Sequence, residues 1–378
     1  MKLDINAVPT PSYVLEEETL RRNLAIFDRV QRESGAKIIL ALKGFAFWSA
    51  FPWIRETLHG ATASSLHEAR LAYEEFKRET HVYSVAFSDA EFPEILKIAD
   101  HIVFNSFSQW RRFRDQVKGS PRKPQCGIRI NPGYSEIKTP LYDPCYANSR
   151  LGVTRAEFKP EDLDGISGLH FHAHCGNNSD TLERVVESFE KLYGEFIPKM
   201  KWINFGGGHH ITRADYDVDR LIRVVKSFRE RHGVEVYLEP GEAVGWRTGP
   251  LVSSVLDIVR NGMDIAILDT SATAHMPDTL EMPYRPEIRG AAEPGVLPHT
   301  YRLGGLTCLA GDVIGDYSFE KPLEIGDRLV FEDMIHYTIV KNTTFNGVNL
   351  PSLCIWTKEG ELKVVRKFGY EDYRDRNS

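Results

Sequence analysis

The chain has 378 residues, 42% hydrophobic and 26% charged, which is enough to bury a sizeable core and to form two domains. A net charge of −6, with basic residues spread along the chain, argues against nucleic acid as a partner. Five cysteines without a CxxC pair indicate free thiols in a reducing compartment. Because no stretch resembles a signal-peptide core or a membrane span, we expect a cytoplasmic protein.

Short apolar runs alternate with amphipathic segments between about residues 20 and 240, a pattern typical of strand–helix units around a parallel sheet. Helices are predicted over Glu18–Glu33, with Gly35 as its stop, and over Asp180–Phe196, with Asp180 as the N-cap. Eight strands favour a closed (β/α)8 TIM barrel over an open sheet. The predicted strands are Lys37–Leu42, Ala61–Ser64, Val82–Ala86, Ile102–Asn105, Gly127–Asn131, Gly168–Ala173, Trp202–Phe205 and Val234–Leu238.

The sequence changes after about residue 250 to short β-rich runs separated by Gly, Pro and Asp. The Pro-rich segment Asp269–Pro298 is predicted to be a long loop, and loops of that length are often functional. We therefore predict an α/β fold with a barrel over residues 12–258 and a C-terminal all-β domain made of 259–378 with 1–11. The strands predicted there include Arg328–Glu332, Ile335–Val340, Leu353–Trp356 and Leu362–Val365.

Four chemically rich stretches follow predicted barrel strands. ALKG, with Lys43, follows the first strand, HFHAHCG ends the sixth, GGGHH follows the seventh and EPGE follows the eighth. Because the active site of such a barrel lies at the carboxyl ends of the strands, we expect these stretches to meet on one rim.

Each stretch has a catalytic and a structural interpretation. Partial burial of Lys43 would free its amine for a Schiff base, whereas a solvated strand-end lysine would be inert. Gly206, Gly207 and Gly208 offer backbone N–H groups to a phosphate, or simply form a tight turn. Glu239 could pair with the ring nitrogen of pyridoxal phosphate (PLP), which makes that cofactor an electron sink, or could cap the next turn.

Three histidines alternate in the sixth stretch. On a strand, His170, His172 and His174 would face the same side, so a metal-dependent barrel hydrolase is the runner-up function. The usual H-x-H of such hydrolases comes at the first strand, where this chain has a lysine instead. We therefore prefer His172 as a ring stacked on a cofactor, with no metal.

ALKG, GLHFH, NFGGGHH and LEPG occur in this order, with TCLAGD and HYTIVKNTTFNG downstream. From TPSYVLEE to FNG, nearly the whole chain resembles the alanine-racemase-fold decarboxylases, which include ornithine, diaminopimelate and carboxynorspermidine decarboxylases. ALKGFAF, NFGGGHHIT, LEPGEAVGW and LDTSATAHMPD resemble in particular the group acting on carboxynorspermidine and carboxyspermidine. The resemblance implies a PLP-dependent decarboxylase of polyamine biosynthesis and a homodimer with shared active sites.

The resemblance also implies residue roles. Lys43 would hold PLP as a Schiff base, and Gly206–Gly208 would bind its phosphate. Glu239 would pair with the ring nitrogen of PLP, and His172 would stack on the face of its ring. Racemases of similar fold place arginine at the ring nitrogen, so a carboxylate there favours decarboxylation.

Two residues of the all-β domain gain roles from the resemblance alone. Tyr337 looks like the family tyrosine that binds phosphate. Cys308 looks like the cysteine that a partner subunit inserts across the dimer interface, where a thiol can protonate the carbanion. Without the resemblance, Cys308 would be interpreted as a buried core cysteine.

The chain departs from the diaminopimelate decarboxylase pattern at two positions. EPGR is replaced by EPGE, with Glu242, and a CESGD-like stretch is replaced by CLAGD, with Leu309. A site for a long cation needs spaced carboxylates, and Glu242, Asp278 and Asp312 are the candidates. For the two aspartates, a solvated or turn-capping role is the alternative.

Three further alternatives remain at this point. A meso-diaminopimelate decarboxylase would share fold and cofactor, although EPGE argues against it. A non-catalytic PLP-binding protein would usually be a lone barrel, without the domain that carries Cys308 and Tyr337. Carboxynorspermidine and carboxyspermidine differ by one methylene, which is worth only ~1 kcal/mol of binding and leaves the choice between them open.

Overall fold

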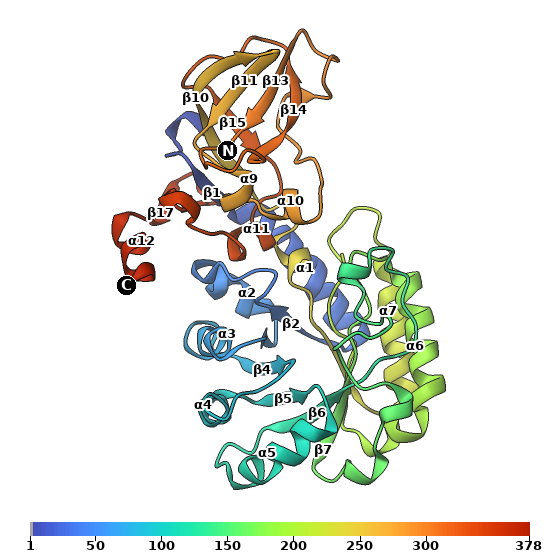
Figure 1. Ribbon diagram of the computed structural model, residues 1–378. Coiled ribbons are helices and arrows are strands. Elements are labelled where there is room, and N and C mark those ends of the chain that lie inside the picture. The colour runs from blue at the N-terminus through green and yellow to red at the C-terminus, as the bar shows by residue number, and fades with distance from the viewer. Residues whose placement is uncertain (1–2) are drawn as a thin grey trace. The chain divides into compact units, whose positions relative to one another are not determined.

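The computed structural model describes residues 3–378 and divides into two compact units (Figure 1). One unit is Asn23–Val244, and the other combines the described chain up to Arg22 with Gly245–Ser378. Met1 and Lys2, which the sequence analysis assigns to the all-β domain, lie outside the described residues.

The first unit is built on a barrel. Within residues 3–378, strands β2 to β9 form a closed parallel barrel, in which each strand pairs with the next and β9 pairs with β2. All eight predicted strands are confirmed, with their ends shifted by a few residues. Their bounds are β2 Lys37–Ala41, β3 Gly60–Ala63, β4 Glu79–Ser84, β5 His101–Phe104, β6 Gln125–Arg129, β7 Ile166–His170, β8 Trp202–Asn204 and β9 Glu235–Leu238.

Side chains fill the barrel interior. The fully buried Trp202 packs with Ile39, Val103 and Tyr237. The strands beside Trp202 carry glycine, and a Cβ on Gly168 would come within 2.1 Å of the indole ring. The large ring therefore requires a residue without a side chain on the neighbouring strand, and the barrel has a packed core rather than a pore.

Helices surround the barrel strands on the outside (Figure 1). The α6 helix buries one apolar stripe, and its N-cap is Asn178, whose side chain accepts from the Ser179 amide, rather than the predicted Asp180. At the end of α1, Gly35 adopts a left-handed φ of 71° and acts as the predicted stop. The helix bounds are α1 Glu17–Ser34, α2 Phe51–Thr57, α3 Leu66–Leu71, α4 Phe92–Ile98, α5 Phe107–Gly119, α6 Ser179–Tyr193, α7 Val218–His232 and α8 Glu242–Gly245.

The second unit is a mixed sheet. Over the described residues the strand order is β12-β14-β13-β11-β10-β1-β16-β17, with β15 paired to β10. A sheet domain is therefore confirmed, but β1 and most of β10, which were predicted to lie in the barrel domain, belong to the sheet. Its strands are β1 Ser12–Glu16, β10 Leu251–Asn261, β11 Met263–Leu268, β12 Ala291–Ala292, β13 His299–Gly304, β14 Val313–Phe319, β15 Arg328–Phe331, β16 Ser352–Trp356 and β17 Leu362–Arg366.

Two local predictions in this unit were wrong. The predicted strand Ile335–Val340 contains the helix α11 (Tyr337–Val340), whose turn is closed by the Lys341 amide donating to the Tyr337 carbonyl at 3.1 Å. The predicted loop Asp269–Pro298 contains two single-turn helices and the short strand β12. Those helices are α9 (Ala272–His275) and α10 (Asp278–Glu281). A further helix, α12 (Tyr370–Asn377), lies near the end of the chain. Among the described residues, no helix has the length and apolar character to cross a membrane.

Candidate active site

Four of the proposed site positions lie at the same end of the barrel. Lys43 comes two residues after β2, His172 two residues after β7, Gly206 two residues after β8 and Glu239 directly after β9. Because the strands are parallel, these positions are all at their carboxyl ends. The barrel topology thus brings together residues that are nearly 200 positions apart in the chain.

The amine of Lys43 has a lower pKa than that of an ordinary lysine. The residue is exposed to solvent, yet it is surrounded by protein atoms that partly desolvate its ammonium group. This partial desolvation, together with the Arg129 cation, lowers the pKa of Lys43, although Glu239 opposes the shift. Among the described residues, its ammonium has neither a hydrogen-bond nor an ion-pair partner. An accessible, unpaired and readily deprotonated amine is suited to nucleophilic chemistry.

The glycine turn after β8 leaves no room for side chains. A Cβ would lie between 2.1 and 2.4 Å from a backbone oxygen at each of Gly206, Gly207 and Gly208. Gly206 and Gly208 also adopt left-handed φ angles of 71° and 82°, which favour glycine. The Gly206 amide donates to Asn204 Oδ1 at 2.8 Å, so the turn is tied to the strand that precedes it.

Glu239 is a largely buried carboxylate held by its neighbours. Asn204 Nδ2 donates to Glu239 Oε1 at 2.7 Å, and His170 Nε2 lies 3.5 Å from Oε2. Burial by itself would raise the pKa of Glu239, but His170 and Asn204 outweigh it and hold the pKa below its ordinary value. Burial also lowers the pKa of His170, although the Glu239 carboxylate opposes that shift. Glu239 therefore stays anionic at neutral pH.

The three alternating histidines do not share a strand face. β7 ends at His170, so His172 and His174 lie in the loop beyond it, where the alternation of a strand no longer applies. His172 is half-buried and its Nδ1 accepts the Gly207 amide at 2.9 Å, while His174 is buried with its ring 4.8 Å from that of His209. Burial holds the pKa of His172 well below its usual value, so an uncharged ring stands beside the glycine turn.

A second carboxylate lies in the same unit, one turn after Glu239. Glu242 begins α8, and its Oε2 lies 2.9 Å from His210 Nε2. The solvent-exposed Cys175 has a raised pKa because of partial burial and the nearby Glu242 charge. Sequence reasoning identified Glu242 but missed Asn204 and His210. The signal for both was present, since they flank the three glycines of the NFGGGHH stretch.

The proposed site residues of the sheet unit lie in short loops and turns. Cys308 is exposed between β13 and β14, and its amide donates to Asn346 Oδ1 at 2.7 Å. Tyr337 is half-buried as the first residue of α11. Asp278, the first residue of α10, is paired with Lys341, which also binds Glu281 Oε2 at 2.5 Å. The charge of Asp278 is therefore partly offset by Lys341, which it shares with Glu281.

Asp312 is buried, with 4% of its surface exposed. Its carboxylate accepts hydrogen bonds from Ser271, Thr273 and Thr307. Asp278 and Asp312, both predicted to bind substrate amines, thus have partners of their own within the chain.

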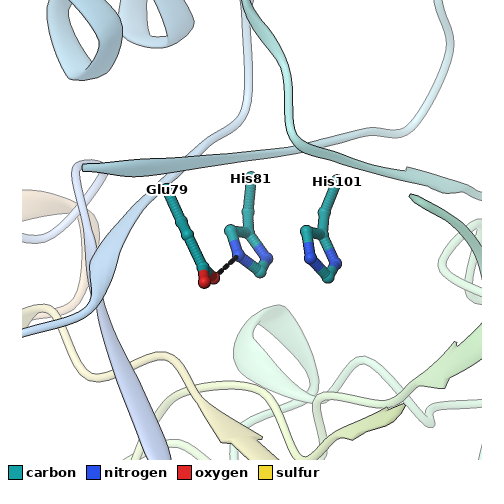
Figure 2. A group of neighbouring side chains, drawn as sticks. All are labelled: Glu79, His81 and His101. Carbon is teal, nitrogen blue, oxygen red and sulfur yellow. Dashed lines mark hydrogen bonds and ion pairs between the residues drawn. The ribbon is translucent and has the colours of Figure 1, made fainter. Parts of the chain in front are cut away.

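A group of possible metal ligands lies at the opposite end of the barrel. Among the described residues, Glu79, His81 and His101 have ligand atoms within 4.8 Å of one another (Figure 2). The two imidazole rings are stacked, with centroids 4.0 Å apart and planes inclined by 11°. Ring-nitrogen lone pairs lie in the ring plane, so stacked rings cannot both direct them at one ion at the usual ~2.0–2.1 Å. His81 instead contacts Glu79 Oε2 at 3.1 Å, and the group packs as a polar cluster.

Comparison with known proteins decides the family. The model "Pyridoxal-dependent decarboxylase, C-terminal sheet domain" matches residues 80–335, which is more than half of the chain. The chain belongs to the pyridoxal-dependent decarboxylases. The family, the carboxy-lyase class and the alanine-racemase-like architecture predicted from the sequence are thereby confirmed.

Relatives of this decarboxylase match it over almost their full length. The carboxyaminopropylagmatine decarboxylase of Synechocystis sp. is 50% identical, covering 98% of this chain and 96% of the relative. The carboxynorspermidine/carboxyspermidine decarboxylase of Campylobacter jejuni is 49% identical, covering 98% and 99%. The crystal structure of carboxynorspermidine decarboxylase complexed with norspermidine, from Campylobacter jejuni, superposes with a TM-score of 0.91 at 48% identity, covering 98% of this chain and 100% of that chain.

Proposed function

We propose that this decarboxylase removes the carboxyl group of carboxynorspermidine or carboxyspermidine, with PLP bound covalently to the amine of Lys43. The proposal rests on one observation: the unpaired amine of Lys43, the anionic Glu239 and the glycine turn all lie at the carboxyl end of the barrel. The substrate assignment draws on the Campylobacter jejuni relative, which is 49% identical.

The residues present fit PLP. The turn of Gly206–Gly208, which a Cβ would fill, suits the phosphate. Glu239 would hold a proton on the ring nitrogen because it remains anionic, and the neutral His172 would cover the ring without adding charge. When bound, PLP supplies an electron sink for the pair that CO2 leaves on the α-carbon.

Lys43 has two tasks in this scheme. Its lowered pKa makes the unprotonated amine more abundant than in an ordinary lysine, and only the unprotonated amine can form the covalent link to PLP. When it is not linked to the cofactor, Lys43 Nζ would be free to move protons at the barrel mouth. Arg129 supports both tasks, because its charge disfavours protonation of Lys43.

Substrate selection rests on the acidic residues. Glu242, oriented by His210 at 2.9 Å, would pair with an ammonium group of the polyamine. The same carboxylate would repel the second carboxylate of meso-diaminopimelate. Asp278 shares its charge with Lys341 and would contribute a weaker attraction for a cation.

Release of the product requires a proton at the α-carbon. We assign it to the thiol of Cys308, which is exposed in its turn and would serve the site of a second copy of the chain in a homodimer. The thiol gives its proton to carbon and regains one from solvent, so the enzyme is unchanged over a cycle. Size-exclusion chromatography with light scattering tests the dimer.

Carboxyaminopropylagmatine is the second candidate substrate, because the Synechocystis sp. relative is 50% identical. It ends in a guanidinium group where the polyamines end in an ammonium group. Steady-state kcat/KM should be compared for carboxynorspermidine, carboxyspermidine, carboxyaminopropylagmatine and meso-diaminopimelate. The proposal expects one of the first two to be preferred by at least about tenfold, which corresponds to ~1.4 kcal/mol. A tenfold preference for carboxyaminopropylagmatine would overturn the substrate assignment, and a preference for meso-diaminopimelate would overturn the class.

A further inference from the structure

The turn that carries Cys308 is joined to a buried carboxylate. Residues 305–311 connect β13 to β14, and Asp312 follows directly after them. Cys308 is exposed, whereas Asp312 has only 4% of its surface exposed. A buried carboxylate is costly unless its oxygens accept hydrogen bonds, so its partners indicate what it does.

Four donor groups occupy the Asp312 carboxylate. The Thr307 amide and hydroxyl donate to Oδ2 at 3.0 and 2.7 Å. The Ser271 hydroxyl contacts both oxygens at 2.8 and 3.0 Å, and the Thr273 amide donates to Oδ1 at 3.2 Å. Asp312 therefore ties the residue immediately before Cys308 to the start of α9, and its oxygens are already engaged before any substrate arrives.

A second anchor holds Cys308 itself. The Cys308 amide donates to Asn346 Oδ1 at 2.7 Å, and Asn346 adopts a left-handed φ of 56°. The Asp312 amide donates to the Leu309 carbonyl at 2.9 Å, which closes the turn behind Cys308. The backbone is thus fixed on both sides of the cysteine while the thiol stays accessible.

We propose that Asp312 is a positioning residue for the thiol of Cys308 and does not bind the substrate. The reason is the geometry of its contacts: Asp312 binds Thr307, the neighbour of Cys308, and has no oxygen left for an ammonium ion. The catalytic part of this inference rests on the proposed function, because it assumes that Cys308 protonates the product. The structural part, that Asp312 fixes the turn, is independent of it.

Hydrogen exchange of the full-length, PLP-loaded protein tests the structural part. Asn at position 312 keeps the size of Asp but replaces one acceptor oxygen with a donor, so it cannot satisfy all four donors. In Asp312→Asn, we expect the protected amides in the peptide covering residues 305–311 to exchange about tenfold faster or more. Asp316→Asn is the matched control, since Asp316 on β14 pairs with Arg302 on β13 and its replacement should leave the turn unchanged. Exchange at the wild-type rate in Asp312→Asn would overturn the proposal.

Kinetics of a double mutant test the catalytic part. Asp312→Asn should lower kcat about tenfold or more and leave KM within about twofold, because a displaced thiol slows proton transfer but not binding. In a Cys308→Ala background, Asp312→Asn should cause no further loss of kcat. A rise in KM that persists in that background would mean that Asp312 binds substrate and would refute the inference.

Should Asp312→Asn fail to fold, Thr307→Val provides the same test, because it removes one donor and keeps the backbone. We expect kcat of Thr307→Val to fall at constant KM. In Thr307→Ser, which retains a hydroxyl at this position, kcat should stay near the wild-type value. Unchanged kcat in Thr307→Val, or failure of Thr307→Ser to restore it, would count against the positioning role. If no carboxylated polyamine is turned over at all, the proposed function fails while the exchange experiment still decides the role of Asp312.

Discussion

The two ends of the barrel contain the same kinds of residue and use them differently. At the amino end, Lys37, Glu79, His81 and Tyr237 contact one another: Lys37 Nζ lies 3.3 Å from the Tyr237 hydroxyl, which donates to Glu79 Oε2 at 3.2 Å. Lys37 Nζ also lies 2.9 Å from Glu235 Oε1. The polar groups at this end largely satisfy each other, as expected of a structural cluster.

At the carboxyl end, the lysine is unpaired, whereas the glutamate and the histidine have partners. Lys43 lacks a hydrogen-bond or ion-pair partner among the described residues, and its pKa is lowered. Glu239 is held anionic, and His172 accepts a hydrogen bond from the glycine turn. A lysine, a glutamate and a histidine in one barrel therefore do not by themselves make a site. The unpaired amine of Lys43 is what distinguishes the carboxyl end.

The two lysines give the sharpest test of this contrast. Lys43→Ala should lower turnover by about 10⁴-fold or more, because the covalent link to PLP is lost. Lys37→Ala should leave kcat within about twofold and destabilise the fold by ~1 kcal/mol, since it removes a partly exposed ion pair. Turnover is measured by CO2 release. Equal losses in the two variants would remove the distinction between the barrel ends.

Replacing the glutamate at the carboxyl end should lower kcat more than replacing the one at the amino end, although the difference should be smaller than for the two lysines. Glu239→Gln should lower kcat by about 10²- to 10³-fold, because a neutral amide does not hold a proton on the ring nitrogen. Glu79→Gln should leave kcat within about twofold, since Glu79 contacts His81 and Tyr237 at the other end. Absorbance spectra of the PLP-loaded variants would show an altered cofactor band in Glu239→Gln only. Full activity of Glu239→Gln would mean that another residue supports the ring.

Two glycines with left-handed φ angles, one in the phosphate turn and one outside it, allow the assignment of the phosphate site to be tested. At Gly208, with φ +82°, a Cβ would lie 2.1 Å from the His174 carbonyl oxygen, so alanine must shift the turn. Gly208→Ala should weaken PLP binding about tenfold or more, as measured by fluorescence titration of the apoenzyme. Gly233, with φ +66° after α7, has open space around its Cβ position. Gly233→Ala should cost ~1 kcal/mol of stability and leave PLP affinity unchanged. Similar PLP affinities in both variants would argue against the phosphate assignment.

The smallest expected effect concerns pH and the amino-end cluster. Burial lowers the pKa of His101 far below its usual value, so the folded protein keeps this ring neutral, while the unfolded chain protonates it below about pH 6.5. The contribution of His101 to the free energy of unfolding is therefore complete above pH 6.5 and is lost as the pH falls. The loss approaches ~1.4 kcal/mol per pH unit.

Replacing His101 with phenylalanine, whose ring does not bind a proton, tests this contribution to the pH dependence of stability. Between pH 7.5 and 5.5, wild type should lose about 1 kcal/mol more stability in urea unfolding than His101→Phe. The variant should keep its decarboxylase activity at pH 7.5. Parallel losses of stability in the two proteins would show that His101 is not held neutral by the fold.

Much of the barrel could be predicted from the sequence because each strand is a short apolar run with a recognisable end. The motifs after Ala41, His170, Asn204 and Leu238 follow from that pattern, since parallel strands place their carboxyl ends together. The helix at Tyr337–Val340 could not be distinguished from a strand by a short apolar run alone.

The polar clusters could not be predicted, because they depend on register and on long-range contacts. His81 and His101 become neighbours only because β4 pairs with β5 in the register that places them side by side. The bonds of Asp312 to Ser271 and of Asp278 to Lys341 join segments 41 and 63 residues apart. A carboxylate in a motif therefore predicts a charge, but whether that charge is already engaged depends on the fold.

We propose that Lys43, and no other lysine, holds the cofactor. The direct measurement is borohydride reduction of the PLP-loaded full-length protein, followed by proteolysis and mass spectrometry of the modified peptide. We expect a reduced pyridoxyl group on Lys43, with loss of the visible absorbance band of the bound cofactor on reduction. An adduct confined to Lys37 or another lysine, or a protein that takes up no PLP, would contradict it.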